Sequence, residues 1–258
     1  MSLNVIQQAG PEGAKDLFVF IHGFGGCAAE WRGLQRHLSD RAPSWAFDLP
    51  GHAGSLDSGI KMTPKNAALA VLEALERRSE RVHVVGHSMG GAVASLMAII
   101  APDRISSLTL LAPGGFGPGI AHDTLTTWAD AQTTADVEAV MPSFFHADYT
   151  IDPRIIQMNA ELRVQPGAVS SLQEIATRLA RNGVQGELPL DDLWTSAVPI
   201  TVIWGRDDAI LPVEQAEALQ PLAKSGRIKL HIVDGMGHSP PVEAPDLVRA
   251  AIAQNLSA

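Results

Sequence analysis

Residues 82–91 have the sequence VHVVGHSMGG, in which a β-branched run ends at a serine flanked by glycines and an alanine-rich segment follows. The first four residues predict a buried strand, and the alanine-rich segment predicts a packed helix. A serine on such a tight strand-to-helix turn needs neighbours without side chains, which Gly86 and Gly90 provide. The pattern therefore predicts that the Ser88 hydroxyl stands at the edge of a sheet as a candidate nucleophile, near the free N–H groups of the new helix. By itself, the pattern also fits an incidental serine in a glycine-rich turn.

Similar loops follow other apolar runs of strand length. Strands that alternate with helical patterns at this spacing predict an α/β fold with a mostly parallel central sheet flanked by helices. Ligands in such sheets bind beyond the carboxyl ends of the strands, so the loops at those ends are expected to meet. These loops are HGFGG at 22–26, PGGFGPG at 113–119, GRDD at 205–208 and GMGH at 235–238.

A serine, an aspartate and a histidine stand at three of these strand ends. The Ser88 hydroxyl needs a base to take its proton, and the imidazole of His238 is suited to that role near neutral pH. An imidazole that gains a proton needs a carboxylate on its other nitrogen, and Asp208 is the candidate. His22 and His87 also fall near the predicted site, where we interpret them as structural hydrogen-bonding residues.

Between residues 117 and 197 the pattern becomes helical, without convincing strands. We predict that this segment is a cap inserted into a core made of residues 1–116 and 198–258. Its aromatic side chains predict an apolar acyl pocket, although packing of the cap onto the core explains them equally well. The candidate substrate-binding residues are Phe116, Trp128, Phe144 and Phe145. After the sheet resumes, a helix is expected over residues 213–222.

Composition excludes several classes of partner. With 258 residues and 46% apolar content the chain can bury one large core, and its net charge of -9 argues against nucleic acid and anionic membranes as partners. The single cysteine, Cys27, allows no internal disulfide, and the nine histidines match no known metal-binding spacing. Neither a signal peptide nor a bilayer-spanning stretch is evident, so we expect a cytoplasmic protein. The sequence does not indicate an oligomeric state.

Together these motifs resemble the α/β-hydrolase fold family over nearly the whole chain. The resemblance implies an α/β-hydrolase fold with a helical cap and no cofactor, and an acid three residues after the glycine of a G-x-x-D pattern, which is Asp208. Asp207 and Asp234 stay open as alternatives. The resemblance also implies an oxyanion hole made by the backbone N–H groups of Phe24 and Met89. The motifs are HGFGG at 22–26, DLPGH at 48–52, GHSMGG at 86–91, WGRDD at 204–208 and GH at 237–238.

Two branches of that family are similar to residues 114–118, GGFGP. One is the carbon-carbon bond hydrolases that cleave ring-fission products of aromatic compounds; the other is the hydrolase-like domain of acetoin dehydrogenase E2 acetyltransferases. The chain departs from the first branch, with His87 in place of an asparagine and Ser239 in place of a tryptophan, and from the second in having no lipoyl domain. We expect a serine hydrolase that cleaves a small or medium carboxylic ester, thioester or lactone. The alternatives are a carbon-carbon bond hydrolase and a noncatalytic ligand-binding protein.

Overall fold

A seven-stranded sheet lies at the centre of the computed structural model, which describes residues 2–181 and 183–254. Every neighbouring pair of strands is parallel except β1 and β3, which are antiparallel. This confirms the predicted α/β class and mostly parallel sheet. In sheet order the strands are β1 Val5–Gln8, β3 Ser44–Phe47, β2 Asp16–Ile21, β4 Arg81–His87, β5 Ile105–Leu111, β8 Ile200–Gly205 and β9 Ile228–Val233.

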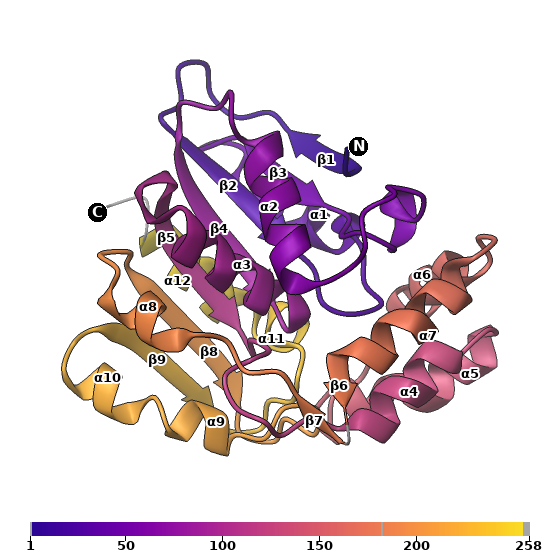
Figure 1. Ribbon diagram of the computed structural model, residues 1–258. Helices are drawn as coiled ribbons and strands as arrows, with labels where there is room; N and C mark the ends of the chain where they lie inside the picture. Colours follow the sequence, from indigo (N-terminus) through magenta and orange to yellow (C-terminus); the bar gives the residue numbers. More distant parts are fainter. Residues whose placement is uncertain (1, 182, 255–258) are drawn as a thin grey trace.

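Helices cover both faces of this sheet (Figure 1). One face carries α2 Pro64–Ala74, α3 Met89–Ile100 and α8 Leu190–Thr195, and the other carries α1 Arg32–Leu38 and α12 Pro245–Gln254. Three short helices lie near the last two strands of the sheet: α9 Glu214–Glu217, α10 Gln220–Lys224 and α11 Pro240–Glu243. The 3-10 helices are η1 Ala28–Trp31, η2 Ala53–Ser55, η3 Pro102–Arg104 and η4 Met141–Phe144.

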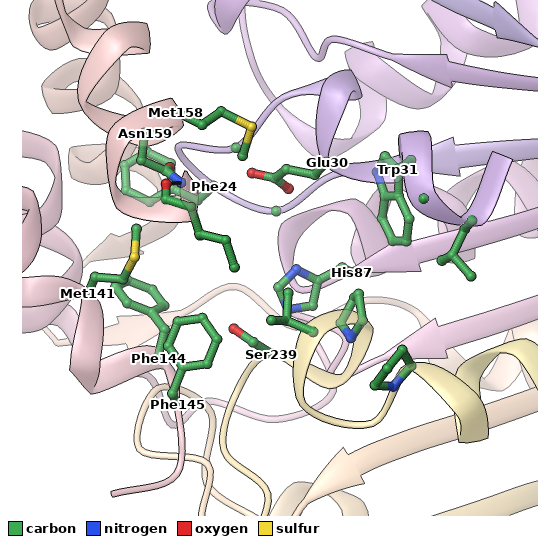
Figure 2. Close-up of a pocket in the computed structure, with 18 of the residues that line it drawn as sticks. Phe24, Glu30, Trp31, His87, Met141, Phe144, Phe145, Met158, Asn159 and Ser239 are labelled. Atoms are coloured by element: carbon green, nitrogen blue, oxygen red, sulfur yellow. Dashed lines mark hydrogen bonds between the residues drawn. The ribbon is translucent and has the colours of Figure 1, made fainter. Parts of the chain in front are cut away.

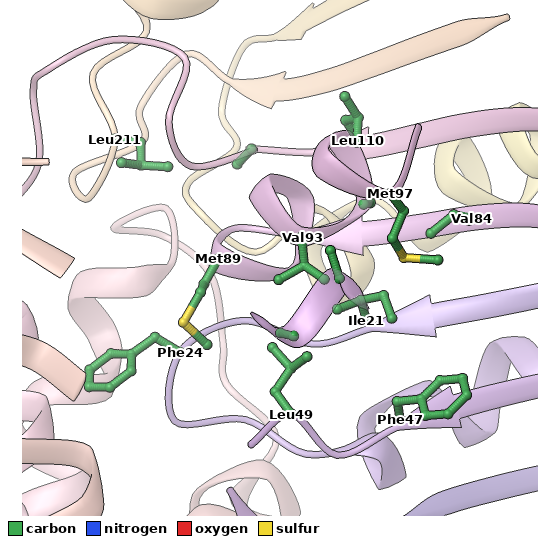
Figure 3. Packing of buried hydrophobic residues seen from close by; sticks show 14 of the residues in the cluster. Ile21, Phe24, Phe47, Leu49, Val84, Met89, Val93, Met97, Leu110 and Leu211 are labelled. Atoms are coloured by element: carbon green, nitrogen blue, oxygen red, sulfur yellow. The ribbon is translucent and has the colours of Figure 1, made fainter. Parts of the chain in front are cut away.

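Strand β2 shows why both faces need a helical cover. Successive side chains of a strand point to opposite faces, and both faces of this strand are apolar. Val19 and Ile21 pack into the cluster under α2 and α3, whereas Phe18 and Phe20 pack into the cluster under α1 and α12. In Figure 3, Ile21 lies on the first of these faces together with side chains from β4, β5 and α3. A continuous apolar run is therefore the signature of a central strand.

Helices α4 to α7 form a separate group beside the carboxyl ends of the strands (Figure 1). We call them the cap helices; all four lie within the predicted insertion. Side-chain caps start two of them, at Thr133 and Asp152. Their bounds are α4 His122–Asp130, α5 Thr134–Val140, α6 Pro153–Arg163 and α7 Ala168–Leu179.

Two expectations about local structure were wrong. The insertion contains a small hairpin, β6 Ala180–Arg181 with β7 Val184–Gln185, because strands of two residues are too short to give an alternating pattern. The helix expected over residues 213–222 is divided into α9 and α10, because Pro221 has no N–H to continue the hydrogen-bond ladder of the first. Among the described residues, no helix is long and apolar enough to cross a membrane.

The packing of the central sheet predicts a difference between two leucines. Leu108 in β5 is fully buried, whereas Leu69 in α2 is 45% exposed. We expect Leu108→Ala to lower the free energy of unfolding by about 2–5 kcal/mol because it leaves a cavity in the core. Leu69→Ala should change it by no more than about 0.5 kcal/mol. Urea denaturation of both variants measures this, and equal losses would contradict the assigned core.

Candidate active site

Ser88 occupies the turn between β4 and α3 in a conformation that residues with side chains rarely adopt. Its φ is 52° and its ψ is -120°, a region that costs on the order of 1–3 kcal/mol. Backbone hydrogen bonds hold the residue there: its N–H donates to the carbonyl of Leu111 at 2.9 Å, and its carbonyl accepts from the N–H groups of Gly91 and Gly114. The strained turn is thus fixed by β5 and by the first turn of α3.

The two flanking glycines are required by close backbone contacts. A Cβ on Gly86 would lie 2.3 Å from the carbonyl oxygen of Gly90. A Cβ on Gly90 would lie 2.3 Å from the carbonyl oxygen of Ile21. Real Cβ atoms do not approach backbone oxygens so closely, so any side chain here would move β2 or α3. The G-x-S-x-G pattern is therefore a packing requirement of this turn.

The structure brings Ser88, His238 and Asp208 into one hydrogen-bonded line. The distance between Ser88 Oγ and His238 Nε2 is 2.9 Å, and that between His238 Nδ1 and Asp208 Oδ2 is 2.8 Å. Since a carboxylate only accepts, Nδ1 carries the proton and Nε2 is free to accept from the hydroxyl. The other oxygen of Asp208 accepts from the backbone N–H groups of Ile210 and Leu211, each at 2.8 Å. The aspartate is thereby fixed in orientation.

The alternative carboxylates lie elsewhere. Asp207 accepts from the backbone N–H of Gly235 at 2.9 Å, and its side chain is 48% exposed. Asp234 pairs with Arg206 on the surface, where its side chain is 85% exposed. Of the three candidate acids, Asp208 alone hydrogen-bonds the His238 ring among the described residues.

Phe24 and Met89 present backbone N–H groups beside the serine. The loop that contains Phe24 passes directly against Ser88, since a Cβ on Gly23 would lie 3.2 Å from the Cβ of Ser88. Met89 is the first residue of α3, so its N–H has no acceptor within the helix. Within the described residues neither N–H donates to a protein acceptor. Two free donors near one hydroxyl are the arrangement that stabilises an oxyanion.

Two buried histidines hold the loop that carries Phe24. His52 Nε2 accepts from the backbone N–H of Gly25 at 3.1 Å, and His22 Nε2 accepts from the N–H of Leu49 at 2.9 Å. Their Nδ1 atoms therefore carry the protons and donate to carbonyls, that of His22 to Gly23 at 2.7 Å. Every ring nitrogen is used, which confirms His22 as a structural residue. His52 was missed, because no pattern in the sequence linked it to residues 22–26.

Burial keeps these histidines neutral. It lowers the pKa of His22 to about 4 and that of His52 to about 3, with the repulsion between the two rings adding to the effect on His52. A proton on either Nε2 would also face a backbone N–H instead of an acceptor. His87 behaves similarly: burial and the nearby His238 lower its pKa to about 3, and its Nε2 donates to the carbonyl of His238 at 2.7 Å.

Glu243 is a second residue that the sequence did not reveal. Its two carboxylate oxygens accept from the backbone N–H groups of Gly237 and Ser239, each at 2.9 Å, on either side of His238. One of them also accepts from the N–H of His146 at 2.7 Å. The short helix α11 thus ties the His238 loop to the segment between α5 and α6. Gly237 and Ser239 lie six and four residues before Glu243, but His146 lies 97 residues away, so only the folded chain brings it to this carboxylate.

A largely apolar cavity of about 250 Å³, drawn in Figure 2, lies next to the Ser88 turn, because its lining includes Gly23, whose Cβ would lie 3.2 Å from the Cβ of Ser88. Ser88, His238 and Asp208 are not among its described lining residues, but their sequence neighbours His87 and Ser239 are, together with Phe24. Of the four aromatic residues predicted to bind substrate, the described lining includes Trp128, Phe144 and Phe145 but not Phe116, which packs edge-on against Trp194 at 5.9 Å. No group of three or more metal-ligating side chains occurs within residues 2–181 and 183–254.

Comparisons with known proteins agree with this architecture. The family model described as alpha/beta hydrolase family matches residues 18–251. A solved meta-cleavage product hydrolase from Pseudomonas fluorescens superposes with a TM-score of 0.82, covers 99% of this chain and 94% of its own, and is 19% identical. The enol-lactonase from Burkholderia xenovorans gives a TM-score of 0.78 at 20% identity, with 99% and 96% of the two chains covered.

Two curated relatives are more similar in sequence. The dihydrolipoyllysine-residue acetyltransferase component of an acetoin cleaving system from Cupriavidus necator is 31% identical over 84% of this chain, which spans only 58% of that relative. The pimeloyl-acyl-carrier-protein methyl ester esterase of Methylococcus capsulatus is 32% identical over 86% of this chain and 87% of its own length. The resemblances to an acetoin-system component and to meta-cleavage product hydrolases are thereby confirmed.

The buried histidines predict that acid destabilises the fold. Their pKa is 6.5 when exposed and about 4 or about 3 in the folded state, so below pH 6.5 the unfolded chain binds protons that the folded chain refuses. The free energy of unfolding should therefore fall between pH 7 and pH 5, by roughly 1–2 kcal/mol for each of His22 and His52. Urea denaturation at the two pH values measures this. His52→Gln should flatten the dependence, whereas His37→Gln on the exposed face of α1 should not; equal slopes in both variants would contradict the assignment.

Proposed function

We propose that this chain, which belongs to the alpha/beta hydrolase family, is a serine hydrolase that cleaves a small or medium carboxylic ester, thioester or lactone. The observation that carries the proposal is the line from Ser88 Oγ through His238 to Asp208, with hydrogen bonds of 2.9 and 2.8 Å. This hydrogen-bonded line activates the serine alcohol for attack, and a protein that only binds its ligand does not need it. The similarity to a curated methyl ester esterase at 32% identity supports ester cleavage.

The proposed reaction has two steps on one serine. As Ser88 Oγ attacks the substrate carbonyl, its proton passes to His238 Nε2, and Asp208 stabilises the imidazolium through Nδ1–H. The carbonyl oxygen becomes negative and accepts hydrogen bonds from the N–H groups of Phe24 and Met89. When the tetrahedral intermediate collapses, His238 returns the proton to the leaving alcohol or thiol. Water then attacks the acyl-enzyme, with His238 again as the base, and releases the acid and the free serine.

A carbon-carbon bond hydrolase acting on a vinylogous diketone acid is the competing reaction. What supports it is the similarity of residues 114–118, GGFGP, to that branch of the family, in a segment that lies against the nucleophile through the hydrogen bond from Gly114 N–H to the carbonyl of Ser88 at 2.9 Å. Turnover of p-nitrophenyl acetate measured beside a vinylogous 1,5-diketone acid separates the two reactions. Cleavage of the diketone acid with no ester hydrolysis would overturn the esterase proposal.

Removing the Ser88 hydroxyl tests its role as the nucleophile. Ser88→Ala should fold as the wild type does and lose hydrolysis of short-chain p-nitrophenyl esters, because the attacking oxygen is gone. A fluorophosphonate probe should label Ser88 in the wild type and leave Ser88→Ala unlabelled, as intact-mass measurement detects. Without labelling of Ser88, a noncatalytic binding protein would be the better description.

Variants of the two adjacent aspartates, Asp207 and Asp208, should differ in kcat. Asp208→Asn should lower kcat by about three to four powers of ten. The amide that then faces His238 Nδ1 has no negative charge to stabilise the imidazolium and does not fix the tautomer of the ring. Asp207→Asn is the matched control, since that carboxylate is half exposed and contacts Gly235 instead of His238; it should stay within about threefold of the wild type. Steady-state kinetics on one ester compares them. If Asp207→Asn were the more damaging change, the assignment of the acid would be wrong.

A further inference from the structure

The cavity beside Ser88 carries few polar side chains, and Glu30 is the acidic one in its described lining. In Figure 2 its carboxylate projects into the space between Phe24, Met158 and His87. Glu30 belongs to η1, which follows the loop carrying the N–H of Phe24. Its carboxylate lies against that loop, since a Cβ on Gly26 would come within 2.6 Å of Glu30 Oε1.

Two neighbouring polar groups are also left as acceptors. Asn159 is 5% exposed, and one hydrogen of its Nδ2 donates to the carbonyl of Ile155 at 3.0 Å, so its Oδ1 and the second N–H of the amide remain for a ligand. His87 donates from Nε2 to the carbonyl of His238, which leaves the lone pair of Nδ1. The inner wall of the cavity therefore offers three acceptors, which are a carboxylate, an amide oxygen and an imidazole nitrogen, and one donor, the second amide N–H of Asn159.

Among the described residues, no cation forms an ion pair with Glu30. Arg163 interacts with it electrostatically, but the described ion pairs include none between the two. The Arg163 guanidinium instead stacks 4.0 Å from the centre of the Trp128 ring and donates to the carbonyl of Asn159 at 2.7 Å. Glu30 is an exposed residue, but the protein atoms around its carboxylate desolvate it enough to raise its pKa to about 7. Asp48 adds to the rise, while Arg163 and a hydrogen bond from the Cys27 N–H oppose it.

The donors of the walls do not change this picture. The indole N–H groups of Trp31 and Trp128 are buried without a partner and do not reach the cavity surface. Arg249 lines the cavity from α12, but it is paired with Asp246 at 3.0 Å. The Ser239 hydroxyl also lines the cavity and can donate or accept. A ligand that reaches the inner wall thus meets mainly acceptors, one of which is a carboxylate.

From this arrangement we propose that Glu30 determines substrate specificity: it favours substrates with a hydroxyl group on the part that fills the cavity and disfavours substrates with a carboxylate there. The proposal rests on the proposed hydrolase function. A hydroxyl can donate to Glu30, to Asn159 Oδ1 or to His87 Nδ1, and hydrogen bonds to charged acceptors are the stronger ones. A substrate carboxylate offers no donor and is repelled by Glu30 across an apolar space.

The test compares kcat/KM for p-nitrophenyl hexanoate, its 3-hydroxy and 6-hydroxy derivatives, and the p-nitrophenyl monoester of adipic acid, at a pH above 8 where Glu30 is ionised. For each enzyme, kcat/KM for the better hydroxy ester is divided by kcat/KM for the hexanoate ester, which gives the hydroxyl ratio. The value of kcat/KM for the adipate ester is divided by the same number, which gives the adipate ratio. In the wild type the first ratio should exceed the second.

Three variants separate hydrogen bonding from charge. Glu30→Leu removes both and should lower the hydroxyl ratio about tenfold while raising the adipate ratio about tenfold. Glu30→Gln keeps an acceptor oxygen without the charge, so it should retain most of the hydroxyl ratio and still raise the adipate ratio. Glu73→Gln, an equal change of charge on the exposed face of α2, is the matched control and should leave both ratios unchanged.

The outcomes distinguish failure of the Glu30 proposal from failure of the hydrolase function. Unchanged ratios in Glu30→Leu, or a wild-type preference for the adipate ester, which would point to Arg249 as its partner, would overturn the proposal about Glu30. If the wild type cleaves none of these esters, the hydrolase function fails, and Glu30 is tested by binding alone in Ser88→Ala. Tryptophan fluorescence, to which Trp128 in the cavity wall contributes, should then report tighter binding of 1,6-hexanediol than of 1-hexanol. That difference should vanish when Glu30→Leu is added, and equal affinities before it is added would overturn the proposal.

Discussion

The left-handed backbone of Ser88 is the constraint on which the rest of the site depends. A residue with φ of 52° at the junction of β4 and α3 persists only because β5 and the first turn of the helix hydrogen-bond it from both sides. The same turn brings α3 so close to β2 that Gly86 and Gly90 admit no side chain. Strain at one residue therefore sets both the direction of the hydroxyl and the position of the helix N-terminus beside it.

Buried polar side chains hold the loops around that serine. His22 and His52 fix the loop of Phe24, and Glu243 fixes the loop of His238 from both sides. These groups satisfy backbone N–H and carbonyl groups that no strand or helix pairs, which buried loops require. Preorganised loops of this kind keep donors and base in place before a substrate arrives, which is the property that electrostatic catalysis needs.

The cavity next to the Ser88 turn is where we propose that the substrate binds and is selected. Its walls come from the cap helices, η4, α11 and α12 as well as from the sheet core, so the chemistry and the selection of substrate reside in different parts of the chain. In the proposed scheme Glu30 connects the two, because it belongs to η1, directly after the loop of Phe24, and lines the cavity together with Met158 and Asn159 of α6. A vinylogous diketone acid carries a carboxylate that a simple ester lacks, so in this scheme one carboxylate in the cavity would favour the ester.

The sequence by itself determined the parallel sheet, the turn at Ser88 and the three strand ends that carry Ser88, Asp208 and His238. These follow from local rules: apolar runs form central strands, glycines mark forced turns, and parallel strands bring their carboxyl ends to one edge. Only the tertiary structure decided that Asp208 instead of Asp207 hydrogen-bonds the histidine, that Phe116 packs away from the cavity, that Glu243 binds the N–H of His146 and that Glu30 lines the cavity. Such contacts join residues far apart in the chain across loops and a cap without a repeating pattern, so no periodicity encodes them.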